Sequence, residues 1–183
     1  FYDLCRLSYL NYPHRKYGLV DSTVIDYAVI NATRDLARTV LFDQMMDWIS
    51  VSPYFRTLAN KALGRTKFPN RIDIISGSRF DQVMGRAIVG AILDEMNFQT
   101  RVANQAYENY NTIKRRVESR FMSRGGLWPA HMWLCSSKSD DAGWLQSYIE
   151  NMKHIPTVRI FSYPIWDVIK DKGIYSGDTF KVF

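Results

Sequence analysis

The 183-residue chain lacks any long hydrophobic segment. Its longest uninterrupted apolar stretch, Ala87 to Leu93 with Gly90 inside it, has only seven residues. A membrane-spanning helix needs about 20 residues of this kind. We therefore expect no membrane-spanning helix and no membrane partner.

Cysteine and histidine are also scarce. Cys5 and Cys135 lie 130 positions apart, each within an apolar run, which favours buried free thiols over a disulfide or a zinc site. His14, His131 and His154 do not have the spacing of metal ligands. The sequence therefore argues against a structural zinc ion.

The composition is that of a folded domain with a basic surface. The chain is 46% apolar and 14% aromatic, which supplies a core and excludes a disordered or low-complexity chain. A total of 24 basic and 18 acidic residues gives a net charge of +6. This balance favours polyanionic partners, and the length suits one domain.

The sequence has no initiator methionine, no signal peptide and no Gly-x-x-x-x-Gly-Lys-Ser/Thr phosphate loop. Its last residues, Phe180 to Phe183, have the pattern of an extended segment. We expect this sequence to be an excerpt of a longer chain, cut at both ends.

The first half of the sequence predicts a strand followed by a helix. The β-rich run Val24–Ile30 predicts the strand, and Asn31 is a good N-cap for a helix. Apolar residues at three- and four-residue spacing predict that helix over Ala32–Ile49, ended by Ser52-Pro53. Residues 56–70 are polar and basic and are predicted to be a connection.

The remaining elements continue the alternation of strands and helices. The run Ala87–Leu93 is bounded by turn residues and ends in two acids, which is typical of a strand buried on both faces of a parallel sheet. We predict further strands over 71–76, 132–135 (also buried) and 157–163, and helices over 101–123 and 140–152. This alternation indicates an α/β fold with a mostly parallel sheet flanked by helices.

Two adjacent acids, Asp94 and Glu95, close the most apolar strand. In open α/β sheets ligands bind beyond the carboxyl ends of the strands, and an apolar strand followed by Asp-Glu is the Walker B pattern. The first carboxylate would hold Mg²⁺ and the second would polarise the water that attacks a γ-phosphate. The alternative is an ordinary strand end that meets solvent.

Ser136 and Ser137 stand at the end of the next predicted strand, beside the two acids in a parallel sheet. Their hydroxyls would sense the γ-phosphate and pass its presence to the following segment. The alternative is a simple helix cap, with Ser139 or Asp140 in that role.

Basic residues provide two further candidates. Arg79 and Arg86 precede the Asp-Glu strand, and either is a candidate to stabilise charge on a transferring phosphoryl group. Arg115, Arg116 and Arg120 lie on the predicted helix 101–123 and are candidates to follow a nucleic-acid backbone. In both cases the alternative is a solvated surface.

Several segments, in this order, resemble the ATPase domain of the large terminase subunits of tailed bacteriophages and related viruses. Ile92–Phe98 resembles the family's Walker B region, and Cys135–Lys138 resembles its coupling motif. The resemblance extends over nearly all of the chain and also includes Phe1–Leu10 with Tyr12-Pro13, Val24–Ala32, Ser52–Phe55, Ile74–Ser78, Met84–Arg86, Tyr163–Asp167 and Tyr175–Phe180.

The resemblance implies a P-loop NTPase fold of the ASCE type, incomplete at its N-terminus, with ATP and Mg²⁺ as cofactors. Asp94 would be the Mg²⁺ ligand, Glu95 the catalytic glutamate, and Ser136 with Ser137 the coupling pair. Residues 1–163 would be the partial ATPase core, and 164–183 the linker towards an RNase-H-like nuclease domain beyond Phe183.

The function implied by this resemblance is a motor that couples ATP hydrolysis to translocation of double-stranded DNA into procapsids. Its partners would be DNA, the capsid portal, the small terminase subunit and further copies in a ring, in the cytoplasm of an infected host cell and transiently at the portal. Because the phosphate loop is expected before Phe1, the excerpt alone should hydrolyse ATP poorly or not at all.

Two other functions remain open from the sequence. One is a helicase-like ATPase that acts on nucleic acid without a capsid, which would need a second RecA-like domain. The other is a degenerate nucleotide-binding or DNA-binding module that has lost its phosphate loop.

Overall fold

A computed structural model describes residues 1–79, 83–99, 105–121, 130–137 and 143–163. The chain divides into two compact units, Phe1–Gln146 and Ser147–Phe183. The first unit contains the sheet and the candidate site. The segment 164–183, predicted as a linker, lies outside the described residues.

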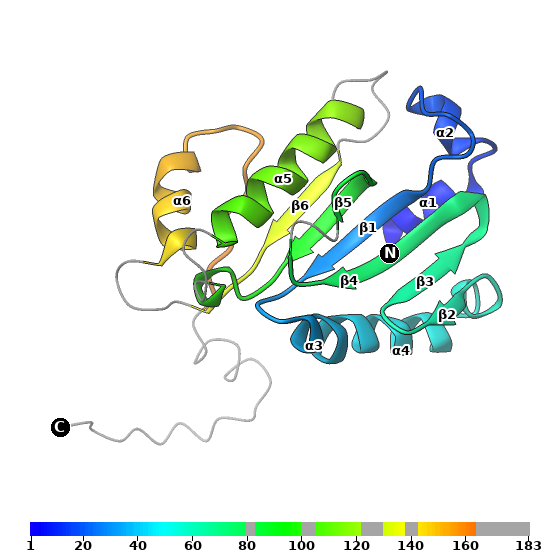
Figure 1. Cartoon of the computed structure of the whole chain (residues 1–183), viewed down its shortest axis with the longest axis horizontal. Helices are drawn as coiled ribbons and strands as arrows, with labels where there is room; N and C mark the ends of the chain where they lie inside the picture. The colour runs from blue at the N-terminus through cyan, green and yellow to red at the C-terminus, as the bar shows by residue number, and fades with distance from the viewer. Residues whose placement is uncertain (80–82, 100–104, 122–129, 138–142, 164–183) are drawn as a thin grey trace. The chain divides into compact units, whose positions relative to one another are not determined.

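A six-stranded, mostly parallel sheet forms the centre of the first unit (Figure 1). The strand order is β2-β3-β4-β1-β5-β6. β4, β1, β5 and β6 are parallel to one another, while β2 and β3 form an antiparallel hairpin that pairs with β4. The strands are β1 (Ile25–Ile30), β2 (Asn60–Ala62), β3 (Arg65–Phe68), β4 (Ile72–Gly77), β5 (Ala87–Leu93) and β6 (His131–Leu134). This arrangement confirms the predicted fold class.

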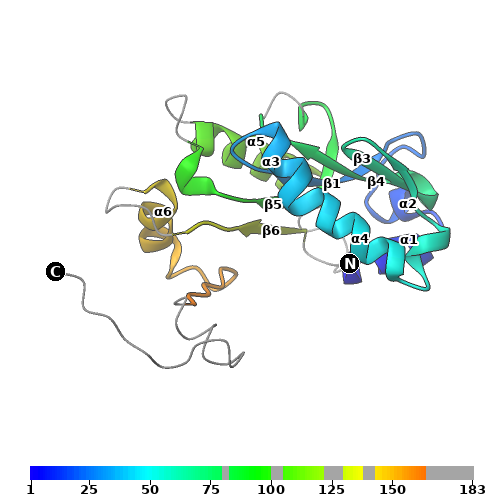
Figure 2. The ribbon, with the colours of Figure 1, turned by 90° about the horizontal axis from the view of Figure 1, so that it is seen from below.

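Helices cover both faces of the sheet, with α5 on one face and α1 and α4 on the other (Figure 2). The α-helices are α1 (Tyr2–Tyr9), α2 (Pro13–Lys16), α3 (Arg34–Leu36), α4 (Asp43–Val51), α5 (Gln105–Arg120) and α6 (Trp144–Met152). A π-helical segment, Ala37–Phe42, joins α3 to α4, and short 3₁₀ turns span Phe55–Thr57, Pro69–Arg71 and Met96–Phe98.

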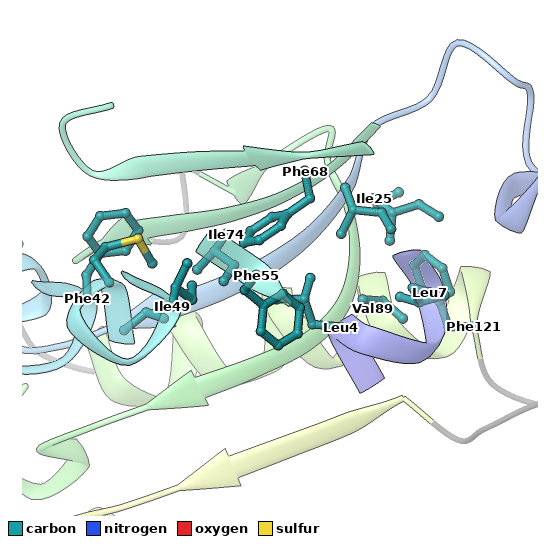
Figure 3. Close-up of a cluster of buried hydrophobic side chains, with 14 of the residues drawn as sticks. Leu4, Leu7, Ile25, Phe42, Ile49, Phe55, Phe68, Ile74, Val89 and Phe121 are labelled. Carbon is teal, nitrogen blue, oxygen red and sulfur yellow. The ribbon is translucent and has the colours of Figure 1, made fainter. Parts of the chain in front are cut away.

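The main core lies between the sheet and the helices α1 and α4 (Figure 3). It contains Leu4 and Leu7 of α1, Phe42 and Ile49 of the long helix, and Ile25, Ile72 and Ile74 of the strands, all nearly inaccessible to solvent. α5 packs against β5, and every residue of that strand except Ile92 is buried. The prediction of a strand buried on both faces is therefore confirmed.

The first strand–helix unit forms as predicted, except at its cap. The helical stretch runs from Arg34 to Val51 with a π-helical segment inside it, and Ser52 ends it. Its N-cap is Thr33, whose Oγ1 accepts a hydrogen bond from Leu36 N at 3.2 Å. The assignment of Asn31 as the N-cap is wrong, because Asn31 is buried and its side chain turns towards the strand ends.

Four other expectations need correction. Residues 56–70 contain the β2–β3 hairpin, which turns at Gly64 with a φ of +67°. β6 is an edge strand with alternating exposed residues and is not buried. Residues 157–163 form no strand. The thiols are free as predicted, but Cys5 is only half-buried and Cys135 is exposed.

The predicted helix 101–123 is present as α5, and the predicted helix 140–152 as α6. Residues 101–104, 122–129 and 138–142, which include Ser139 and Asp140, lie outside the described residues. In the part of the chain that the structure describes, no helix is both long and apolar enough to cross a membrane.

Candidate functional site

The carboxyl ends of the four parallel strands meet at one edge of the sheet. Ile30 at the end of β1 is level with Gly77 of β4 and with Leu93 of β5, and Leu93 is level with Leu134 of β6. The polar residues that follow these strands are therefore neighbours: Asn31, Ser78, Asp94, Glu95, Ser136 and Ser137. The sequence predicts that Asp94 and Glu95 lie beside Ser136 and Ser137, and the register of β5 with β6 agrees with this prediction.

Asp94 is held in place by its neighbours. Its backbone N–H donates to the carbonyl of Ile30 at 2.8 Å, and Asn31 Nδ2 donates to Asp94 Oδ2 at 3.0 Å. Gln99 Nε2 donates to the Asp94 carbonyl at 2.8 Å. Burial raises the pKa of the Asp94 carboxyl, although a backbone hydrogen bond from Glu95 opposes this effect. A cation beside this carboxylate would offset the cost of its burial.

Glu95 has an unusual backbone and an unpaired oxygen. Its φ of 51° and ψ of 42° lie in the left-handed region, a conformation that costs a non-glycine residue about 1–3 kcal/mol and that clusters at functional sites. The Oε2 atom is buried and has no hydrogen-bond partner among the described residues. A buried carboxylate oxygen without a donor is costly, so this atom is suited to a water, a metal ion or a ligand.

Ser136 is tied directly to the loop that carries the two acids. Its Oγ accepts a hydrogen bond from Asn97 N at 3.1 Å, while Met96 N donates to the carbonyl of Cys135 at 3.2 Å. Ser137 takes part through its carbonyl, which accepts from Asn97 Nδ2 at 3.0 Å. The two predicted coupling serines thus contact the segment just after Glu95, one through its hydroxyl and the other through its backbone.

The same loop also reaches the start of α6. Asn97 Oδ1 accepts a hydrogen bond from Leu145 N at 2.9 Å, so a side chain from outside the helix satisfies a donor in its first turn. Asn97 is buried and joins three segments, yet the sequence reasoning missed it. Its position two residues after Glu95 was the available signal.

A second missed group connects the site to α5. Asn109 is fully buried, and its Nδ2 donates to Gln99 Oε1 at 2.9 Å and to the carbonyl of Ser78 at 3.3 Å. Gln105 Nε2 also donates to Ser78, at 3.1 Å. An asparagine among the apolar residues of the helix face was the signal for this network.

The two candidate arginines lie at opposite ends of the sheet. Arg79 follows Ser78 at the carboxyl edge and is exposed, so it remains a candidate for this site. Arg86 precedes β5, and its Nη1 lies 3.1 Å from Asp26 Oδ1. The extended β5 strand carries the chain from Arg86 to Asp94, a span of about 26 Å. Arg86 therefore does not serve the Asp94–Glu95 site of its own chain.

The three arginines of α5 are also remote from the two acids. α5 begins near Ser78 and Gln99 and runs back to Phe121, whose ring packs 4.8 Å from that of Tyr17 at the amino edge. Arg115 is exposed, and Arg116 and Arg120 are half-buried. Their predicted contact with DNA therefore concerns a different surface from the nucleotide edge.

The residues at the carboxyl edge fit Mg²⁺ bound together with a nucleotide. The described residues hold no cluster of three or more His, Cys, Asp or Glu side chains suited to a metal ion. Mg²⁺ in nucleotide sites needs only one or two carboxylates, because water and phosphate oxygens complete its coordination. The Asp94 carboxylate meets that requirement, and the unpaired oxygen of Glu95 lies at the same edge to orient a water, while the 183 residues contain no Gly-Lys phosphate loop.

The fold and this edge are those of a P-loop domain: a mostly parallel α/β sheet, flanked by helices, in which the buried strand β5 is followed by two acids. The chain belongs to the family described as "Uncharacterized protein MJ0330, N-terminal P-loop domain", whose model matches residues 1–176. No curated protein matches the chain. P-loop domains typically bind nucleotides with Mg²⁺. The family description supports a P-loop domain and does not identify a viral terminase.

Proposed function

We propose that this domain hydrolyses a nucleoside triphosphate at the edge formed by Asp94 and Glu95. The observation that carries the proposal is the Glu95 carboxylate. It combines a buried oxygen that has no partner among the described residues with a left-handed backbone, and it lies next to Asp94, which is half-buried and held by Asn31. An acid at a solvated strand end would need neither burial nor strain. The P-loop family match supports the same class of activity.

Each residue at this edge has a separate role in the proposal. Asp94 would hold Mg²⁺, and Asn31 keeps the Asp94 carboxylate oriented by donating to its Oδ2. Glu95 orients the attacking water and accepts its proton. When bound, Mg²⁺ would neutralise negative charge on the nucleotide phosphates. Ser136 would report the state of the site, and the hydrogen bond from Asn97 N, two residues beyond Glu95, to its hydroxyl supports this role.

We propose that a phosphate loop on the N-terminal side of Phe1 completes the site. Support comes from β6, which ends the sheet and has no partner on its outer side among the described residues. A further strand beside β6 would bring a loop to the same carboxyl edge as Asp94. α1 would then be the end of the helix that follows that loop.

The finer proposal is that hydrolysis drives the translocation of double-stranded DNA, as in the packaging motors that the sequence resembles. The order of the motifs and the contact between Ser136 and the Asp94–Glu95 loop support it. The portal, the small terminase subunit and a homo-oligomeric ring would be partners, and in a ring Arg86 or Arg79 would act on a neighbouring subunit. DNA-stimulated hydrolysis without strand separation would favour this motor, whereas displacement of one strand of a duplex would favour a helicase.

Nucleotide binding tests the site itself. A fluorescent ATP analogue is titrated into the full-length protein with Mg²⁺ or with EDTA. Asp94→Asn should remove most of the Mg²⁺-dependent gain in affinity, because the carboxylate that holds the ion is replaced by a neutral amide. Asp35→Asn, which changes an exposed acid on α3, is the matched control. Equal Mg²⁺ dependence in wild type and Asp94→Asn would refute the assignment.

A further inference from the structure

A second polar surface lies at the amino ends of the parallel strands, at the opposite edge of the sheet from Asp94. α1 ends there, α2 follows it, and α5 ends nearby (Figure 1). Asn70 Nδ2 donates to the carbonyls of Ser8 and Leu10 at 3.2 and 3.1 Å, which joins α1 to the start of β4. We call the following six residues the amino-edge patch: Tyr9, Tyr12, Arg15, Lys16, Arg71 and Arg120.

The patch contains two exposed tyrosine rings. Tyr9 is 72% exposed, and its ring stacks on that of Tyr54 with centroids 5.2 Å apart and an interplanar angle of 6°. Because one face of Tyr9 is covered by Tyr54, the exposed area includes the other face. Tyr12 is 62% exposed, and the guanidinium of Arg15 lies 4.6 Å from its ring centroid. Such rings are stacking platforms for unpaired bases.

The patch also contains four cationic side chains, of which Arg15 lies over the Tyr12 ring. Arg15, Lys16 and Arg71 are exposed and Arg120 is half-buried. Asp21, which pairs with Arg15 at 3.3 Å, offsets one of these four positive charges. The patch therefore has a net positive charge, which complements a phosphate backbone.

The backbone beneath the patch is strained. Among the described residues, four non-glycine residues have a positive φ: Tyr12, Asn70, Arg71 and Glu95. Glu95 belongs to the nucleotide site, and the other three all lie on or beside the amino-edge patch. Strain of this kind costs about 1–3 kcal/mol for each residue and clusters at functional sites. Its presence here is independent of the charge and the exposed rings.

We propose that the amino-edge patch binds single-stranded nucleic acid. Bases stack on Tyr9 and Tyr12, while phosphates pair with Arg15, Lys16, Arg71 and Arg120. A single strand fits better than a duplex, because base faces are hidden in the stack of a duplex. The surface is separate from the Asp94–Glu95 edge, so it binds without nucleotide and without hydrolysis.

Fluorescence anisotropy tests this proposal with the intact chain in the absence of nucleotide. The probes are a labelled 20-nucleotide oligo(dT) and a duplex of the same length. The single strand should bind more tightly. Replacing either tyrosine by alanine should weaken its binding roughly fivefold to hundredfold, and replacement by phenylalanine should leave it nearly unchanged. In Lys16→Glu and Arg71→Glu the log–log salt slope should fall by about 0.7 for each phosphate that the protein no longer binds.

Matched variants at the carboxyl edge serve as controls. Tyr107→Ala removes a ring that is 55% exposed on α5, and Arg34→Glu reverses an exposed charge on α3; both should bind oligo(dT) as the wild type does. Circular dichroism checks that each variant is folded. If Tyr9→Ala is unstable, Tyr12→Ala and Lys16→Glu still test the proposal. Equal affinity for the duplex, or unchanged oligo(dT) binding in Tyr12→Ala, would overturn the proposal. Glu95→Gln should bind oligo(dT) normally, so this proposal and the hydrolysis proposal fail separately.

Discussion

Replacing Asp26 with asparagine should remove a large pH dependence from the stability of this fold. Asp26 is 1% exposed on β1. Its Oδ1 accepts from Arg86 Nη1 at 3.1 Å, while Oδ2 has no partner among the described residues. The pKa of Asp26 is raised to about 6, mainly by burial. The charge of Arg86 opposes this rise, and the charge of Asp73 in the neighbouring strand adds to it.

The sign and size of the effect follow from this pKa. In the unfolded chain Asp26 titrates near 3.8, so between pH 4 and pH 6 the folded protein binds more protons than the unfolded one. Stability therefore falls as the pH rises through this window. The difference of roughly two pKa units corresponds to about 3 kcal/mol. Asparagine does not titrate, so the variant lacks this contribution.

Urea unfolding at pH 4, 5, 6 and 7 measures the effect in wild type, Asp26→Asn and the exposed control Asp35→Asn. The unfolding free energy of Asp26→Asn minus that of wild type should rise by about 2 kcal/mol from pH 4 to pH 7, slightly less than the full effect because the unfolded Asp26 is already partly deprotonated at pH 4. Any change in packing or hydrogen bonding that the amide introduces beside Arg86 adds an offset that depends little on pH in this range. A difference that stays constant across the four pH values would refute the reasoning.

Three further variants test the fold by the same unfolding assay. In Gly90→Ala the new Cβ would lie 3.1 Å from the Tyr27 ring and 3.2 Å from the His131 carbonyl, so we expect a loss of about 1–3 kcal/mol; an unchanged midpoint would contradict this close approach. Thr33→Ala removes the cap of the long helix and should cost about 1 kcal/mol, and no loss would restore Asn31 as the candidate cap. Ile49→Ala should cost about 2–5 kcal/mol, whereas a loss below about 1 kcal/mol would argue against its core position.

The parallel strands could be predicted because their apolar runs are short and bounded by turn residues. Ala87–Leu93 is the clearest example: its length and its two terminal acids indicated both a buried strand and the edge where a site forms. The β2–β3 hairpin could not be predicted in this way. Its residues are mostly polar and exposed, and pairing with β4 provides the stabilisation that their local pattern does not indicate.

The candidate site was predicted in part. Asp94, Glu95 and Ser136 follow strands, so parallel register alone brings them together. Asn97, Gln99 and Asn109 act through hydrogen bonds between segments up to 48 positions apart, and no local pattern encodes such contacts. Arg86 was assigned from its closeness in sequence to Asp94, but an extended strand carries the two residues to opposite edges of the sheet.

Hydrolysis of ATP by the full-length protein carrying Glu95→Gln tests the central claim most directly. Phosphate release is measured with Mg²⁺ beside binding of the fluorescent analogue, and Glu108→Gln, an exposed change on α5, is the control. We predict that Glu95→Gln binds nucleotide like the wild type and loses hydrolysis by about a hundredfold or more, because the group that orients the water and accepts its proton is gone. Wild-type turnover in Glu95→Gln would contradict the account.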